Sequence, residues 1–130
     1  MAIILKSKSE VESIGQTGRI VADILAELRL AVRPGITTAE LDDLAAQALR
    51  QRDARSSTLG YIHEGFSYPA SLCTSVNDEV IHSIPGSRVL QEGDILTLDL
   101  LSPIWGSKEG KNTLSTKLHM CVIIHSWLQQ

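Results

Sequence analysis

The chain has 130 residues, of which 43% are hydrophobic and 21% are charged, and its formal net charge is −3. Such a length and composition predict one globular domain with a hydrophobic core. The acidic balance argues against a nucleic-acid-binding surface, which needs clustered basic side chains to displace counterions from phosphates. No run approaches the roughly 20 apolar residues that span a bilayer, so we expect no membrane partner and a cytoplasmic location.

Two amphipathic helices are predicted in the first fifty residues. Residues 9–31 carry apolar or small side chains at steps of three and four, which is typical of a helix with one buried stripe. The stripe consists of Ile14, Gly18, Val21, Leu25 and Leu28. A second helix is predicted to begin near Thr38, where Thr37 and Glu40 have the spacing of a capping box. Its predicted buried face consists of Leu41, Leu44, Ala45, Ala48 and Leu49.

From Tyr61 onward, short extended runs alternate with turn residues, which indicates antiparallel strands and hairpins. Residues 71–76 and 79–82 are predicted to pair around an Asn-Asp turn. A further strand is predicted over 94–101, where alternation places three leucines on one face and Asp99 on the other. The predicted fold class is therefore α/β (α+β), with N-terminal helices packed on an antiparallel sheet.

Residues 101–130 differ in composition from residues 1–100. Their basic residues are all lysines, and they hold both tryptophans of the chain. We interpret them as a divergent C-terminal tail, which arose by degeneration or by translation out of the ancestral frame. His119, Cys121 and His125 could be taken as zinc ligands, but a tetrahedral site needs a fourth group, and the run around them is typical of an ordinary apolar strand.

Residues 68–100 resemble type I methionine aminopeptidases, whose usual pattern reads YPxSLCTSVNxxVxHGIP and then GDIxxxDx. The matching runs here are YPASLCTSVNDEVIHSIP, which ends at Pro85, and EGDILTLDL, which contains Asp99. The likeness covers about residues 1–100, including the two predicted helices. It implies an aminopeptidase-like N-terminal half-domain with half of a pita-bread (creatinase/aminopeptidase) fold.

The resemblance also implies roles for five residues. Asp99 matches a ligand of two divalent metal ions, which are cobalt, manganese, iron or zinc in the family. His82 matches a catalytic histidine that also binds the substrate near the scissile amide. Tyr68, Cys73 and Phe66 match positions that line the pocket for a methionine side chain. The residues alone leave other roles open: a solvated or paired carboxylate, a structural histidine, and core positions for the tyrosine and the thiol.

The remaining ligands of that metal centre have no counterpart in the sequence. In the family, a second aspartate follows at the position occupied here by Gly110, and no aspartate follows Asp99 in this chain. The neighbouring Glu109 has the wrong phase along a strand. We therefore expect the metal ions not to be retained, and we expect a truncated chain that is inactive alone.

The family activity implied by the resemblance is metal-dependent removal of the initiator methionine from nascent proteins. The implied partners are N-terminal methionyl peptides, the ribosome and a missing C-terminal half. Two alternatives stay open at this point. One is a non-catalytic module that binds nascent peptides or the ribosome, and the other is a frameshifted fragment without a function.

Overall fold

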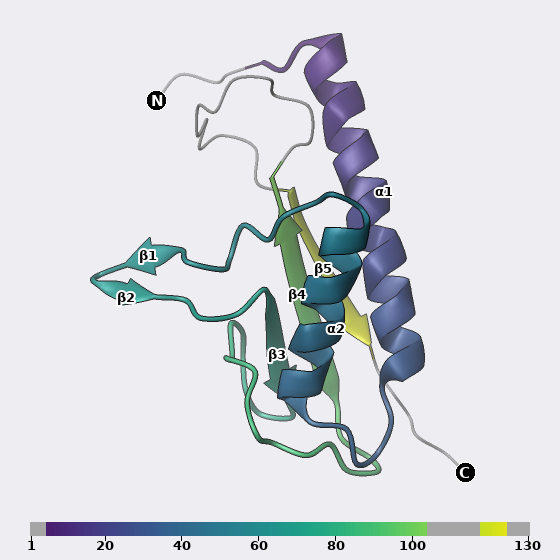
Figure 1. The fold of residues 1–130 in the computed structure, drawn as a ribbon, viewed down its shortest axis with the longest axis vertical. Coiled ribbons are helices and arrows are strands. Elements are labelled where there is room, and N and C mark those ends of the chain that lie inside the picture. Colours follow the sequence, from purple (N-terminus) through teal and green to yellow (C-terminus); the bar gives the residue numbers. More distant parts are fainter. Residues whose placement is uncertain (1–4, 104–117, 125–130) are drawn as a thin grey trace.

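The computed structural model describes residues 5–103 together with the backbone of residues 118–124. In these residues two helices cover one face of a three-stranded antiparallel sheet, and a short hairpin projects away from it (Figure 1). The elements are α1 (Lys8–Ala31), α2 (Thr38–Gln51), β1 (Ile62–His63), β2 (Phe66–Ser67), β3 (Leu72–Val76), β4 (Leu96–Ser102) and β5 (Leu118–Ile124). Among the described helices, none is long and apolar enough to cross a membrane.

Both helices begin at capping boxes. The predicted box of α2 is confirmed: Glu40 N–H donates to Thr37 Oγ1 at 3.1 Å, and Thr37 N–H donates to Glu40 Oε2 at 2.8 Å. A second box, which the sequence prediction missed, joins Ser7 and Glu10, so α1 begins at Lys8, one residue before the predicted start. Each box satisfies backbone N–H groups that lack a partner in the first turn of a helix.

The sheet has the order β3-β4-β5, and its register is set by apolar pairs. Leu72 lies opposite Leu100, and Val76 lies opposite Leu96. Leu96, Leu98 and Leu100 of β4 are fully buried in the core beneath the helices, as their alternation predicted. Helix α1 packs on β4 and β5, and helix α2 packs on β3. Asp99 therefore lies on the sheet face opposite the helices.

Two sequence predictions about packing are wrong. Residues 79–82 form no strand, and β3 pairs with the leucine-rich β4 instead. Asn77, with φ 57°, turns the chain out of the sheet; its N–H donates to Ile95 O, and its Oδ1 accepts from Ile95 N–H. These bonds close the β3–β4 connection at its base. Leu44, predicted to be buried, is 39% exposed because it faces an open hollow between the two helices.

The connection between β3 and β4 is fastened to the start of α2. Thr38 N–H donates to Arg88 O at 3.0 Å, and Ala39 N–H donates to Gly86 O at 2.9 Å. The Thr38 hydroxyl makes a second bond to Gly86 O at 3.0 Å. N–H groups of the first helical turn thus bind the segment that follows His82, and they fix its path beside the sheet.

The projecting hairpin has a two-residue turn at Glu64 and Gly65. Their φ values are 49° and 83°, which is the left-handed geometry that matches the twist of a tight hairpin. All four strand residues of β1 and β2 are exposed. The hairpin is therefore stabilised by its turn geometry rather than by core packing.

Candidate functional site

The predicted metal-ligand position is a buried carboxylate on the outer face of the sheet. Asp99 in β4 lies directly opposite Cys73 in β3, and their side chains are 8% and 3% exposed. Directly opposed residues of antiparallel strands have neighbouring side chains on the same face. The β3–β4 register thus brings together two residues that are separated by a long loop in the sequence.

Tyr68 joins this pair from the segment before β3. Its side chain is partly buried, and its hydroxyl donates towards Leu72 O at 3.2 Å and Ser83 O at 3.1 Å. Burial raises the pKa of the Tyr68 hydroxyl well above its usual range, and the adjacent Cys73 thiol and the Asp99 charge add to the increase. Burial also raises the pKa of the Cys73 thiol, and the charge of Asp99 contributes to this rise. The thiol is consequently protonated at neutral pH and is a poor nucleophile.

His82 and Phe66 lie outside this buried group. His82 is exposed and has a left-handed backbone with φ 59°. The next residue, Ser83, links it to the buried group because the Ser83 carbonyl accepts the Tyr68 hydroxyl and Thr74 N–H. Phe66 is 55% exposed in the projecting hairpin (Figure 1). The substrate-binding role expected of Phe66 stays a prediction.

Asp42 is a supporting residue that the sequence prediction missed. From α2, its Oδ1 accepts hydrogen bonds from Ser71 N–H at 2.9 Å and Leu72 N–H at 2.8 Å. Partial burial raises the pKa of this carboxyl, and the two backbone N–H bonds oppose the rise. Asp42 thereby fixes the start of β3, the strand that carries Cys73. Its position directly after Leu41, in the predicted buried face of α2, is a signal that could have indicated an anchoring role.

The described residues do not by themselves fit a metal centre. Divalent cations of hydrolases are held by several oxygen or imidazole ligands. Among residues 5–103, no group of three or more histidine, cysteine, aspartate and glutamate side chains is placed to hold an ion. At the predicted metal-ligand position, the carboxylate of Asp99 lies opposite the protonated thiol of Cys73. We therefore assign no metal-dependent step to these residues.

The alternative zinc ligands of the tail are only partly described. His119 and Cys121 belong to β5, whose backbone pairs with β4 so that Cys121 lies opposite Asp99. The apolar strand predicted over residues 122–127 is confirmed for the backbone of residues 122–124, which belong to β5. His125, Glu109 and Gly110 lie outside the described residues, so the zinc site stays untested.

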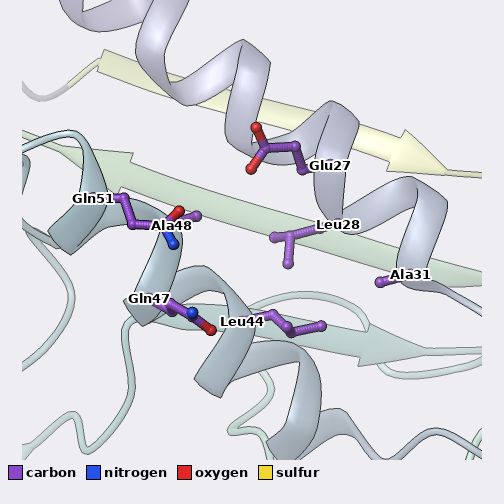
Figure 2. A pocket seen from close by; sticks show the side chains of 7 residues that line it. All are labelled: Glu27, Leu28, Ala31, Leu44, Gln47, Ala48 and Gln51. Atoms are coloured by element: carbon purple, nitrogen blue, oxygen red, sulfur yellow. The ribbon is translucent and has the colours of Figure 1, made fainter.

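A shallow hollow of about 210 Å³ lies between the two helices (Figure 2). Leu28, Ala31, Leu44 and Ala48 form its apolar wall, and Glu27, Gln47 and Gln51 complete the lining. Because the helices cover the face of the sheet opposite Asp99, this hollow is separate from the Cys73–Asp99 pair. It contains no part of the predicted substrate pocket.

The chain is similar to known peptidases over most of its described length. The model of metallopeptidase family M24 matches residues 12–106. A methionine aminopeptidase of Clostridium acetobutylicum is 47% identical over 98 residues, which are 75% of this chain and 38% of that protein. Methionine aminopeptidase 1 of Bacillus subtilis is 44% identical over 98 residues, with the same coverage.

Solved structures agree with this assignment. The crystal structure of methionine aminopeptidase from Rickettsia prowazekii superposes with a TM-score of 0.73 at 29% identity, covering 78% of this chain and 39% of that one. A Xaa-Pro dipeptidase from Bacillus anthracis, at 16% identity and a TM-score of 0.57, shares the fold. The chain thus spans less than half the length of these relatives, and its α/β architecture is part of the pita-bread fold. It belongs to metallopeptidase family M24, and within that family it resembles the methionine aminopeptidases.

Proposed function

We propose that these 130 residues carry part of a methionine aminopeptidase site, which removes initiator methionine from nascent chains in the cytoplasm. The observation that carries the proposal is the buried Cys73–Asp99 pair on the free face of the sheet, in a chain similar to enzymes named methionine aminopeptidase. A buried carboxylate costs solvation energy, and a functional role explains why such a cost is tolerated. Asp99 is the inherited metal-ligand position in this proposal.

The other roles in this proposal are those implied by the resemblance to methionine aminopeptidases. His82, on the loop fastened beside it, hydrogen-bonds the substrate amide near the scissile bond. Cys73 and the ring of Tyr68 form the wall of a pocket for a methionine side chain, where sulfur and an aromatic edge make favourable contacts with the thioether. Phe66 adds an apolar side chain from the hairpin.

We further propose that this part does not hydrolyse peptides alone. A metal-activated water needs more ligands than the single carboxylate that the described residues place there. Large apolar side chains near His82 are exposed, with Val80 at 86%, Ile81 at 62% and Ile84 at 47%. Contiguous exposed apolar surface is typical of an interaction site. A complementary half, supplying the missing ligands and covering this surface, is the partner that fits; nascent chains at the ribosome are the substrates.

A peptidase assay with and without a complementary half tests the proposal. Purified residues 1–130 are incubated with a Met-Ala-Ser peptide and cobalt or manganese, and we expect no turnover. Addition of the remaining segment of the Clostridium acetobutylicum relative is expected to produce turnover that Asp99→Asn abolishes. Asp78→Asn, at an exposed turn, is the matched control and retains it. Turnover by the chain alone, or by the complemented Asp99→Asn variant, would contradict the proposal.

A further inference from the structure

The Tyr68 hydroxyl lies at the crossing point of β3 and the loop that carries His82. It donates towards two backbone carbonyls, Leu72 O at 3.2 Å and Ser83 O at 3.1 Å. One carbonyl belongs to β3, and the other belongs to the residue directly after His82. The hydroxyl therefore ties the loop to the strand, while the aromatic ring remains available to line a pocket.

Ser83 is fixed from β3 as well. Its carbonyl accepts Thr74 N–H at 3.0 Å, and its N–H donates to Ser75 Oγ at 3.4 Å. The Tyr68 hydroxyl is thus one of three groups that bind this single residue. Such convergence on one residue is unusual for a loop, whose backbone polar groups more often face water.

The backbone of His82 needs an external constraint. Its φ of 59° is a left-handed conformation that residues other than glycine seldom adopt, although histidine does so more often than most. A strained residue persists only where its surroundings hold it. His82 is exposed, so the surroundings that hold the residue include the hydrogen bonds made to the backbone of Ser83.

We propose that Tyr68 is a positioning residue, whose hydroxyl holds the loop that carries His82 against β3 and so fixes the position of His82 relative to this strand. The importance of this positioning for catalysis rests on the proposed function, whereas the positioning itself can be tested independently of that function.

The test is NMR spectroscopy of Tyr68→Phe, which removes the hydroxyl and keeps the ring. Loss of a neutral hydrogen bond is expected to increase hydrogen exchange at Thr74 N–H about fivefold. The backbone order parameter of His82 is expected to fall from about 0.85, typical of rigid backbone, to below about 0.6. Tyr61→Phe, which changes a tyrosine that is 49% exposed, is the matched control and leaves both values unchanged.

A second variant separates positioning from general stability. Ser75→Ala removes the other side-chain bond to Ser83, so it is expected to shift the His82 signals in the same direction, and the double variant is expected to show non-additive changes. The inference would be overturned by unchanged His82 order in Tyr68→Phe, or by equal loosening in Tyr61→Phe. Neither measurement needs hydrolysis, so absence of peptidase turnover after addition of the complementary half would refute the proposed function without refuting this one.

Discussion

Replacement of Thr74 by valine tests whether β3 contains a polar group retained at a cost in stability. Thr74 is 2% exposed and shares its strand face with Leu72 and Val76, which belong to the core beneath the helices. Its Oγ1 has no hydrogen-bond partner among the described residues. A buried hydroxyl without a partner loses its hydration without compensation.

The expected gain follows from this environment. Removal of an unsatisfied buried hydroxyl relieves about 1–3 kcal/mol, and the methyl group that replaces it adds about 0.8 kcal/mol of apolar burial. Because some of this gain is lost to imperfect packing, we expect Thr74→Val to raise the free energy of unfolding by about 1–2 kcal/mol. The matched variant Thr74→Ser keeps the hydroxyl and loses a methyl group, so it is expected to lower this energy by about 1 kcal/mol.

Urea denaturation followed by circular dichroism measures both variants against the unmodified chain. The midpoint of Thr74→Val is expected at higher urea with an unchanged slope, which shows that stability has changed rather than the compactness of either state. A loss of more than about 0.5 kcal/mol in Thr74→Val would refute the reasoning, because it would mean that the hydroxyl has a partner in solution.

Three further predictions follow from the described contacts. Leu98→Ala, at a fully buried position, is expected to lower the free energy of unfolding by about 2–5 kcal/mol. Leu44→Ala, at a position that is 39% exposed, is expected to lower it by less than about 1 kcal/mol in the same urea assay. Hydrogen bonds from the N-cap residue Thr37 lower the pKa of Glu40 from its ordinary 4.5. The contribution of Glu40 to stability is therefore present above that pH and is lost as the pH falls through the lower pKa of the folded state. Thermal melts between about pH 3 and 7 are expected to show a smaller acid-induced loss of stability in Glu40→Gln than in the unmodified chain, and an equal loss would contradict the capping interaction. Alkylation of Cys73, followed on its peptide by mass spectrometry, is expected to be at least about a hundredfold slower in the native chain than in urea, and equal rates would show that the thiol is accessible.

Features that depend on local sequence could be predicted from it. The capping box at Thr37 and Glu40 involves residues three positions apart, and the alternation in β4 separates Leu98 from Asp99 without information from elsewhere in the chain. Both are therefore visible in the sequence as spacing alone. The resemblance to methionine aminopeptidases, carried by contiguous runs, likewise predicted the family.

Features that depend on distant contacts could not be predicted in this way. The strand expected over 79–82 failed because Asn77 bonds to Ile95, at the far end of a long connection, and turns the chain out of the sheet. The anchoring role of Asp42 depends on backbone N–H groups 29 and 30 residues farther along the chain. For the candidate site, the resemblance named Cys73 and Asp99, but their direct opposition follows only from the β3–β4 register.

Metal titration of residues 1–130 tests the central claim most directly. The claim is that the described residues provide one inherited ligand position, Asp99, and cannot hold a pair of ions without a complementary half. Isothermal titration with manganese or cobalt is predicted to show no saturable binding of two ions per chain, and Asp99→Asn is predicted to leave the titration unchanged. Saturable binding of two ions that Asp99→Asn abolishes would contradict the account.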